Sequence, residues 1–246
     1  MAKLVLLNLL ALWAFAATWT GKLDKVYDLS QLNLHYEGIH YYDGDLYTGT
    51  VSGKNIFRFD PDDFSTSSAA TVDKVGDNHN AGNQVLFGLC SSSSKDRIYG
   101  ALGSFSGTEL GGIAYWNDKM EFQKAYTVTG QALVNDCVVK GDYVYFTGSR
   151  SGPSVMACDL DLDSCSTIYS GSLLSPTTSV GANGIVYMDD FLIVAQYDDG
   201  RLVKVPVKDG QATTGDVANV SIVGDILDGA DGLVRIDDDV IIVVTS

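Results

Sequence analysis

Basic residues are scarce in this sequence of 246 residues, in which 16 lysines and arginines stand against 31 aspartates and glutamates. The resulting net charge is -15. A nucleic acid or an anionic membrane is bound through clustered cations that neutralise phosphate groups. We therefore expect neither kind of partner. Metal ions and cationic ligands are compatible with this charge.

The sequence also lacks the short motifs of several common enzyme classes. It contains no Walker, Rossmann, His-Glu-x-x-His, Gly-x-Ser-x-Gly or Cys-x-x-Cys pattern, which argues against nucleotide binding, zinc proteolysis and serine hydrolysis. Only three histidines occur, His35, His40 and His79, and no pair has the spacing of metal ligands. Beyond the N-terminal stretch no apolar period of 3.6 residues appears, so almost no helix is expected.

One phrase recurs along the chain and is clearest in residues 181–207. It consists of a polar residue before glycine, an apolar strand, an Asp/Gly turn and a second apolar strand. Its five copies begin at Glu37, Phe87, Asn135, Asn183 and Asp231, at steps of 50, 48, 48 and 48 residues. With 46% hydrophobic residues the chain can bury a large core. Short strands at this period predict an all-β fold, a β-propeller.

Residues 1–17 predict a secretory signal peptide. Lys3 precedes the apolar run from Leu4 to Ala17, which ends in small residues with Ala14-x-Ala16 spacing. A membrane anchor is the alternative, but a span needs roughly 20 apolar residues. The propeller is therefore expected over residues 24–246 of a secreted protein, with no membrane partner after signal removal.

Secretion favours disulfides between the four cysteines. Cys158 and Cys165 are close enough in sequence to close a hairpin, so a disulfide is predicted between them. Cys90 and Cys137 lie on neighbouring repeats and form either a second bridge or two free core thiols.

Three further segments give weaker signals. The residues from Asp62 to Gly82, rich in Ser, Thr, Asp and Asn, predict the longest loop. Asp159, Asp161 and Asp163 alternate with leucines as in a strand, and the glycine and closing glutamate of an EF-hand are missing, so no calcium loop is expected. Asn219-Val-Ser221 is a sequon, which predicts a glycan on Asn219.

Equivalent positions of successive propeller repeats face one channel, so the first residues of the five copies should form a ring. Carboxylates and amides there would be costly to bury without a partner. Side-chain oxygens of Glu, Asp and Asn suit a hard divalent cation. The alternative is that these polar residues only cap strands and form turns.

In this ordered set the chain resembles the regucalcin/gluconolactonase family of six-bladed propellers. Glu37-Gly38, Asn135-Asp136, Asn183-Gly184 and Asp231-Gly232 match the family's Glu-Gly, Asn-Asp, Asn-Gly and Asp-Gly phrases in order and spacing. The resemblance implies that Glu37, Asn183 and Asp231 bind a divalent metal, calcium first, with manganese, magnesium and zinc as alternatives. It also implies that Asn135 contacts a small-molecule substrate and that Asp231 acts as general base.

The sequence departs from this family before and after Asn135. Members that hydrolyse sugar lactones often carry arginine two residues before this asparagine and glycine two residues after it, whereas this chain has Leu133 and Cys137. A sugar lactone is therefore in doubt as the substrate. The expected function is a secreted, metal-dependent hydrolase of lactones or related esters. The alternatives are a non-catalytic propeller that binds a ligand or protein, and a metal-free propeller like strictosidine synthase.

The repeat also bears on the number of blades. A sixth copy would begin near residue 279, beyond Ser246, so we expect a monomeric six-bladed propeller truncated in blade five. A five-bladed ring closed by the short strand Lys25 to Leu29 is the alternative.

Overall fold

The computed structural model describes residues 3–8, 36–51, 55–59, 73–77, 84–106, 110–224 and 227–245. These residues form β-strands and two short 3-10 helices, η2 (Ser172–Leu174) and η3 (Thr214–Asp216), as the missing helical period predicts. Among them, no helix is long and apolar enough to cross a membrane. The chain divides into an N-terminal unit, residues 22–134, and a C-terminal unit, residues 1–21 and 135–246.

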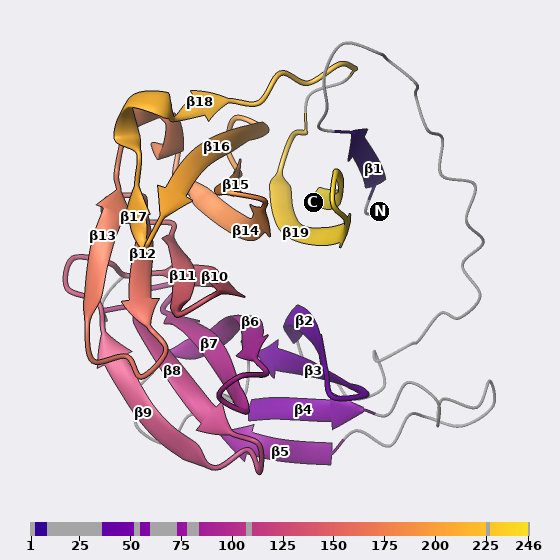
Figure 1. The fold of residues 1–246 in the computed structure, drawn as a ribbon, viewed down its shortest axis with the longest axis vertical. Coiled ribbons are helices and arrows are strands. Elements are labelled where there is room, and N and C mark those ends of the chain that lie inside the picture. Colours follow the sequence, from indigo (N-terminus) through magenta and orange to yellow (C-terminus); the bar gives the residue numbers. More distant parts are fainter. Residues whose placement is uncertain are drawn as a thin grey trace. The chain divides into compact units, whose positions relative to one another are not determined.

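The N-terminal unit contains two antiparallel sheets in which each strand pairs with the one before it (Figure 1). The first sheet has the order β2 (Tyr36–Tyr42), β3 (Asp45–Thr50), β4 (Asn55–Phe59), β5 (Asp73–Asp77). The second has the order β6 (Val85–Ser92), β7 (Arg97–Gly103), β8 (Gly112–Asn117), β9 (Phe122–Thr127). Since β5 lies within residues 62–82, the prediction of a loop there is wrong for this strand.

The C-terminal unit contains three antiparallel sheets (Figure 1). The first has the order β10 (Val134–Lys140), β11 (Tyr143–Gly148), β12 (Ser154–Asp159), β13 (Cys165–Tyr169). The second has the order β14 (Ala182–Met188), β15 (Phe191–Gln196), β16 (Arg201–Lys208), with β17 (Gln211–Ala212) and β18 (Ala218–Asn219) both paired to β16. The third has the order β19 (Ala230–Asp237), β20 (Val240–Thr245), β1 (Lys3–Asn8).

The predicted three-stranded meander at residues 181–207 is confirmed as β14 to β16. The strand β1 comes from residues 1–17, whose removal as a signal peptide stays a prediction. The predicted closing strand from Lys25 to Leu29 lies outside the described residues.

The sheet of β14 to β18 is buried on both faces. Leu192 and Val194 of β15 pack in one apolar cluster with the sheet of β10 to β13. Ile193 and Ala195 pack in another with the sheet of β19 and β20. Because successive side chains of a strand point to opposite faces, a strand buried on both sides needs apolar residues throughout. This explains why β15 contains a continuous run of apolar residues and no alternation of apolar and polar residues.

The same stacking builds the core of the N-terminal unit. Tyr47 and Ile56 of its first sheet share an apolar cluster with Leu86, Leu102 and Trp116 of its second. The last four of these side chains are almost completely shielded from solvent. Fully burying one large apolar side chain stabilises the folded state by about 1.5–3 kcal/mol, so sheet-on-sheet contact is the main source of stability within each unit.

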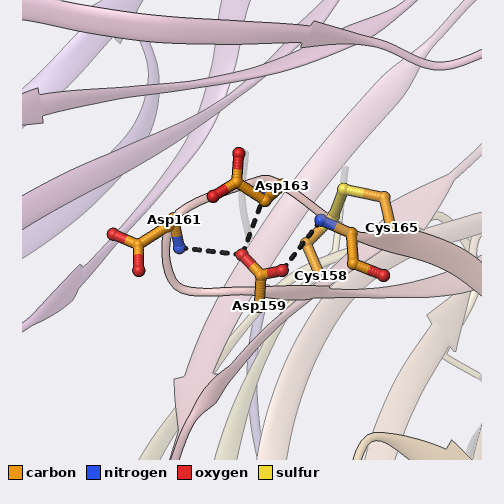
Figure 2. Close-up of a disulfide and its surroundings, with 6 residues drawn as sticks. Cys158, Asp159, Asp161, Asp163 and Cys165 are labelled. Atoms are coloured by element: carbon orange, nitrogen blue, oxygen red, sulfur yellow. Dashed lines mark hydrogen bonds between the residues drawn. A yellow bond between two sulfur atoms is a disulfide. The ribbon is translucent and has the colours of Figure 1, made fainter.

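The predicted disulfide between Cys158 and Cys165 is present and closes the hairpin of β12 and β13 (Figure 2). The other two cysteines, Cys90 and Cys137, are also disulfide-bonded. The described residues contain no free cysteine, so the alternative of two free core thiols is wrong.

The turn inside the disulfide loop is organised by Asp159 (Figure 2). Its carboxylate accepts hydrogen bonds from the backbone N–H groups of Asp161 and Asp163, each at 3.0 Å, and of Ser164 at 2.8 Å. Leu162 has a φ of 52° and is buried. The segment is therefore a hydrogen-bonded turn and not the strand suggested by its alternating leucines. Both Asp159 oxygens accept hydrogen bonds from the backbone of the turn.

We expect the double substitution Cys158→Ala and Cys165→Ala to lower the free energy of unfolding by about 2.5 kcal/mol, because closing so short a loop restricts the unfolded chain. Chemical denaturation of this variant and the wild type measures the difference. An unchanged denaturation midpoint would contradict the expected contribution.

Candidate functional site

Two of the repeated polar–glycine phrases lie at β-bulges of the C-terminal unit. Between paired residues of β14 and β15, residues 183–184 lie opposite Ala195 alone. Between paired residues of β19 and β20, residues 231–232 lie opposite Val244 alone. A bulge adds one residue to a strand and changes the direction of nearby side chains. The bulges thus occur where the strands carry two of the predicted metal ligands.

Gly184 lets β14 and β19 come close together. A Cβ at this position would overlap the carbonyl oxygen of Asp231 and would lie 2.8 Å from the nitrogen of Leu233. Both atoms belong to the backbone, so neither can move aside cheaply. Only glycine fits such a contact. The glycine after Asn183 therefore brings this asparagine beside the strand that carries Asp231.

Asn183 and Asp231 are in direct contact. Asn183 is 5% exposed, and its side-chain amide donates a hydrogen bond to the Asp231 carboxylate. Burial raises the pKa of Asp231 above its usual value, and the hydrogen bond from Asn183 partly opposes this rise. Two of the three predicted ligands are therefore held together in a partly desolvated environment.

Asp136 joins this pair from β10. Its Oδ2 accepts a hydrogen bond from the backbone N–H of Ile185 at 3.0 Å, and its Oδ1 accepts one from the backbone N–H of Cys137 at 2.8 Å. The pKa of Asp136 is raised to about 7, mainly by burial; the two backbone hydrogen bonds oppose this rise, and the negative charge of Asp231 adds to it. Asp136, Asn183 and Asp231 form what we call the acid cluster.

Thr147 of β11 fixes the backbone around the acid cluster. Its hydroxyl donates a hydrogen bond to the carbonyl of Asn183 at 2.5 Å and accepts one from the backbone N–H of Asp136 at 3.1 Å. The side chain is fully buried. Because β-branched side chains have few rotamers, this pair of hydrogen bonds fixes the position of β10 relative to β14.

The other predicted site residues lie outside the acid cluster. Asn135 is half-buried on β10, one residue before Asp136. Glu37 is half-buried on β2, opposite Gly49, in the N-terminal unit. Asn219 is exposed on β18. The roles of Glu37 and Asn135 stay predictions, as does the glycan on Asn219.

Sequence reasoning missed Asp136 as a member of the cluster. The available signal was the pair of polar residues, Asn135 and Asp136, inside the otherwise apolar strand β10. The repeat period indicates Asn135 instead, because this residue holds the first position of its repeat. Adjacent residues of a strand point to opposite faces, so a shift of one residue selects a different side chain.

The acid cluster has the chemistry of a hard-cation site. Within the described part of the chain, no Lys, Arg or His contributes to the pKa of Asp136 or Asp231. No group of three or more His, Cys, Asp or Glu side chains is placed to hold a metal among these residues. Asn183 contacts Asp231, however, and the charge of Asp231 acts on Asp136, so three oxygen-bearing side chains lie near one another. They fit a divalent cation, which would offset two partly buried negative charges.

Asp198 anchors the loop that leads into β14. Its Oδ2 accepts hydrogen bonds from the backbone N–H groups of Ser179 at 2.7 Å, Thr178 at 3.0 Å and Val180 at 3.1 Å, and from the hydroxyl of Thr178 at 2.8 Å. Burial raises the pKa of Asp198, but these hydrogen bonds outweigh burial and leave the pKa below its usual value. The turn after β15 thus fixes the chain just before Asn183.

We expect Gly184→Ala to lower the free energy of unfolding by about 1–3 kcal/mol, because the added methyl group pushes β14 away from β19. Gly215→Ala is the matched control, since no atom lies within 4 Å of a Cβ there. Thermal denaturation of both variants makes the comparison. Equal melting temperatures would contradict the close approach of the two strands.

We expect Asp198→Ala to destabilise the protein by about 1 kcal/mol at pH 7. A carboxylate with a lowered pKa in the folded state stabilises it above the unfolded pKa, and this effect disappears as the pH falls through the folded value. The difference in melting temperature from wild type should therefore shrink below about pH 4. The exposed Asp216→Ala is the control. A difference that does not depend on pH would exclude a role for the charge.

No family model matches the sequence, and no curated protein sequence matches it. Solved structures do match. The calcium-binding protein regucalcin from Agrobacterium tumefaciens aligns with a TM-score of 0.59 and 12% identity, over 84% of this chain and 79% of that chain.

Two β-propeller domains align in the same way. The Cps50 (Swd1) domain from Myceliophteria thermophila has a TM-score of 0.53 and 13% identity, over 83% of this chain and 59% of that chain. The WD40 domain of Doa1 has a TM-score of 0.52 and 14% identity, over 84% of this chain and 60% of that chain. The chain thus spans about three fifths of these two structures. At such identities the matches establish the fold, and the chain is a β-propeller.

Proposed function

We propose that the acid cluster binds a divalent cation, calcium first, and that the protein is a secreted hydrolase of lactones or related esters. The observation that carries the proposal is that the partly buried carboxylate of Asp231 contacts the buried Asn183 and lies close enough to the partly buried Asp136 for the two charges to interact. Burying two carboxylates side by side is unfavourable unless a cation or a proton compensates their charge. A hard divalent ion with carboxylate and amide ligands provides that compensation.

Each side chain of the acid cluster has a different role in the proposed reaction. Asp231 accepts the proton of the attacking water at its carboxylate and returns it to the oxygen of the leaving alcohol. Asn183 orients that carboxylate through its hydrogen bond. Asp136, held by the N–H groups of Ile185 and Cys137, keeps its position relative to β14. A bound divalent cation would supply Lewis acidity toward the ester carbonyl oxygen.

Two further observations support the proposal. The structure of regucalcin, one of those that align with this chain, is that of a calcium-binding protein. Disulfide bonds, which all four cysteines form, are typical of proteins that fold in an oxidising compartment. Signal removal after residue 17 and a glycan on Asn219 belong to the same proposal of secretion.

A non-catalytic role, in which the protein binds a ligand without hydrolysing it, is the second candidate. Leu133 favours it, because the residue is 2% exposed and lies in the apolar core. The position therefore cannot supply a cation that grips a polar substrate. Activity toward substrates that need such a cation would be lost, while metal binding at the acid cluster would remain.

Calorimetric titration of calcium, manganese and magnesium into metal-stripped, full-length protein tests the proposal. We expect one ion per chain with a Kd no weaker than about 1 mM. Asp231→Ala should weaken binding at least tenfold, about 1.4 kcal/mol, and should abolish lactone hydrolysis. The exposed Asp118→Asn is the control for loss of one negative charge and should bind as the wild type does.

The outcomes separate the two candidates. Failure of the wild type to bind any of the three ions, or unchanged binding by Asp231→Ala, would reject both the metal site and the hydrolase. Normal metal binding without hydrolysis of any lactone in a panel would reject the hydrolase and support the non-catalytic role.

A further inference from the structure

The two sheets of the N-terminal unit meet at a pair of polar side chains. His40 lies on β2 and Ser91 on β6, and the Nε2 atom of the histidine is 2.7 Å from the hydroxyl oxygen of the serine, at hydrogen-bond distance. Both residues belong to the unit of residues 22–134. An ionisable side chain therefore takes part in the contact between the first strands of two stacked sheets.

The imidazole of His40 faces the second sheet. On the neighbouring strand β3 its partner is Tyr47, and directly paired residues of adjacent strands project to the same face. Tyr47 is 6% exposed and belongs to the apolar cluster that the two sheets share. Ile39 and Tyr41, on either side of His40, project to the opposite face and are 67% and 62% exposed. The half-buried His40 is thus turned toward the core of the unit.

The backbones of β2 and β6 touch two residues before His40. Gly38 has a φ of 62°, and a Cβ there would lie 2.6 Å from the carbonyl oxygen of Phe87 and 3.0 Å from the Cα atom of Gly88. Glycine is the residue that permits both this φ and this contact. Because the two strands are in direct contact, full hydration of a charged imidazole requires that β2 and β6 move apart.

Within the described residues, no charge on the surrounding elements compensates a positive charge at His40. Its strand packs against β3 and β6. β6 carries no charged side chain, and Asp45 of β3 forms an ion pair with Arg58 of β4 at 3.7 Å. Asp96, in the turn after β6, forms a hydrogen bond with Tyr42. The other titratable groups of β2 and β3 and of the turns after β2 and β6 are Tyr36, Glu37, Tyr41, Asp43, Tyr47 and Lys95. None of these groups shifts the pKa of His40, which burial lowers to about 4.

We infer that His40 makes the contact between β2 and β6 sensitive to acid: a proton on its imidazole places a positive charge between the two sheets and separates these strands. In the neutral form the imidazole shares a hydrogen bond with Ser91 and the contact is closed. In the protonated form the charge has no compensating partner, and burying such a charge is unfavourable. The inference does not depend on the proposed hydrolase.

The direction of the pH effect follows from the two pKa values. In the unfolded chain the pKa of a histidine is about 6.5, whereas that of His40 in the folded protein is lowered to about 4. Between these values the folded protein binds fewer protons than the unfolded chain. Its stability is therefore complete above about pH 6.5 and is lost as the pH falls toward the folded value.

Chemical denaturation of the full-length wild type and of His40→Gln, from about pH 7.5 to about pH 4.5, tests the inference. Glutamine offers a polar amide in place of the imidazole and carries no charge in this range. We expect the unfolding equilibrium constant of the wild type to rise at least about tenfold more than that of His40→Gln. Lys119→Gln, which removes an exposed cation, should keep the pH dependence of the wild type. Equal pH dependence of wild type and His40→Gln would overturn the inference.

Hydrogen exchange locates the effect in the fold. Protection factors of the amides of β2 and β6 should fall at least about fivefold in the wild type between about pH 7 and about pH 5. Those of β15, in the C-terminal unit, should change less. A fall in β2 and β6 that persists in His40→Gln would overturn the inference.

NMR titration of the full-length wild type gives a test that does not require His40→Gln to fold. The signal of the His40 ring should show a neutral imidazole from about pH 7.5 down to about pH 5.5, because protonation at this position is unfavourable. A midpoint near pH 6.5, the value of an exposed histidine, would show that the contact does not resist protonation and would also overturn the inference.

Discussion

Face-to-face stacking of β-sheets is the contact on which this structure depends. The sheet of β14 to β18 buries one face in a cluster with Leu192 and Val194 and the other in a cluster with Ile193 and Ala195. Such a sheet cannot be stable alone, because both faces would expose apolar surface. Stacking also brings the first strands of successive sheets together, and β14 meets β19 so closely that only Gly184 fits between them.

That close approach has an electrostatic consequence. Polar residues on β10, β14 and β19 lie in a partly desolvated region. There, burial raises the pKa values of both Asp136 and Asp231. Backbone N–H groups donate hydrogen bonds to the carboxylate of Asp136, and the amide of Asn183 donates one to that of Asp231. Hydrogen bonds of this kind do not remove the repulsion between two carboxylates. The arrangement is therefore suited to a cation, and this suitability underlies the proposed function.

Much of the fold could be predicted from the sequence, because the apolar runs and turn residues of each repeat predict its strands and turns locally. The run Phe191–Gln196 and its flanking turns are confirmed as β15. The strand β5, Asp73–Asp77, was missed because it contains only one large apolar residue and is defined by its pairing with β4. The pair of Asn183 and Asp231 was predicted from the repeat period. Asp136 was not, because backbone hydrogen bonds to Ile185 and Cys137 depend on which side of β10 faces β14.

The central claim is that the acid cluster is a cation site. A crystal structure of the full-length protein, from crystals grown in the presence of calcium, tests this claim most directly. Oxygen ligands surround calcium at about 2.3–2.6 Å, and this distance identifies the ion. The account predicts an ion at this distance from side-chain oxygens of Asn183 and Asp231. A cluster without an ion under these conditions would contradict it.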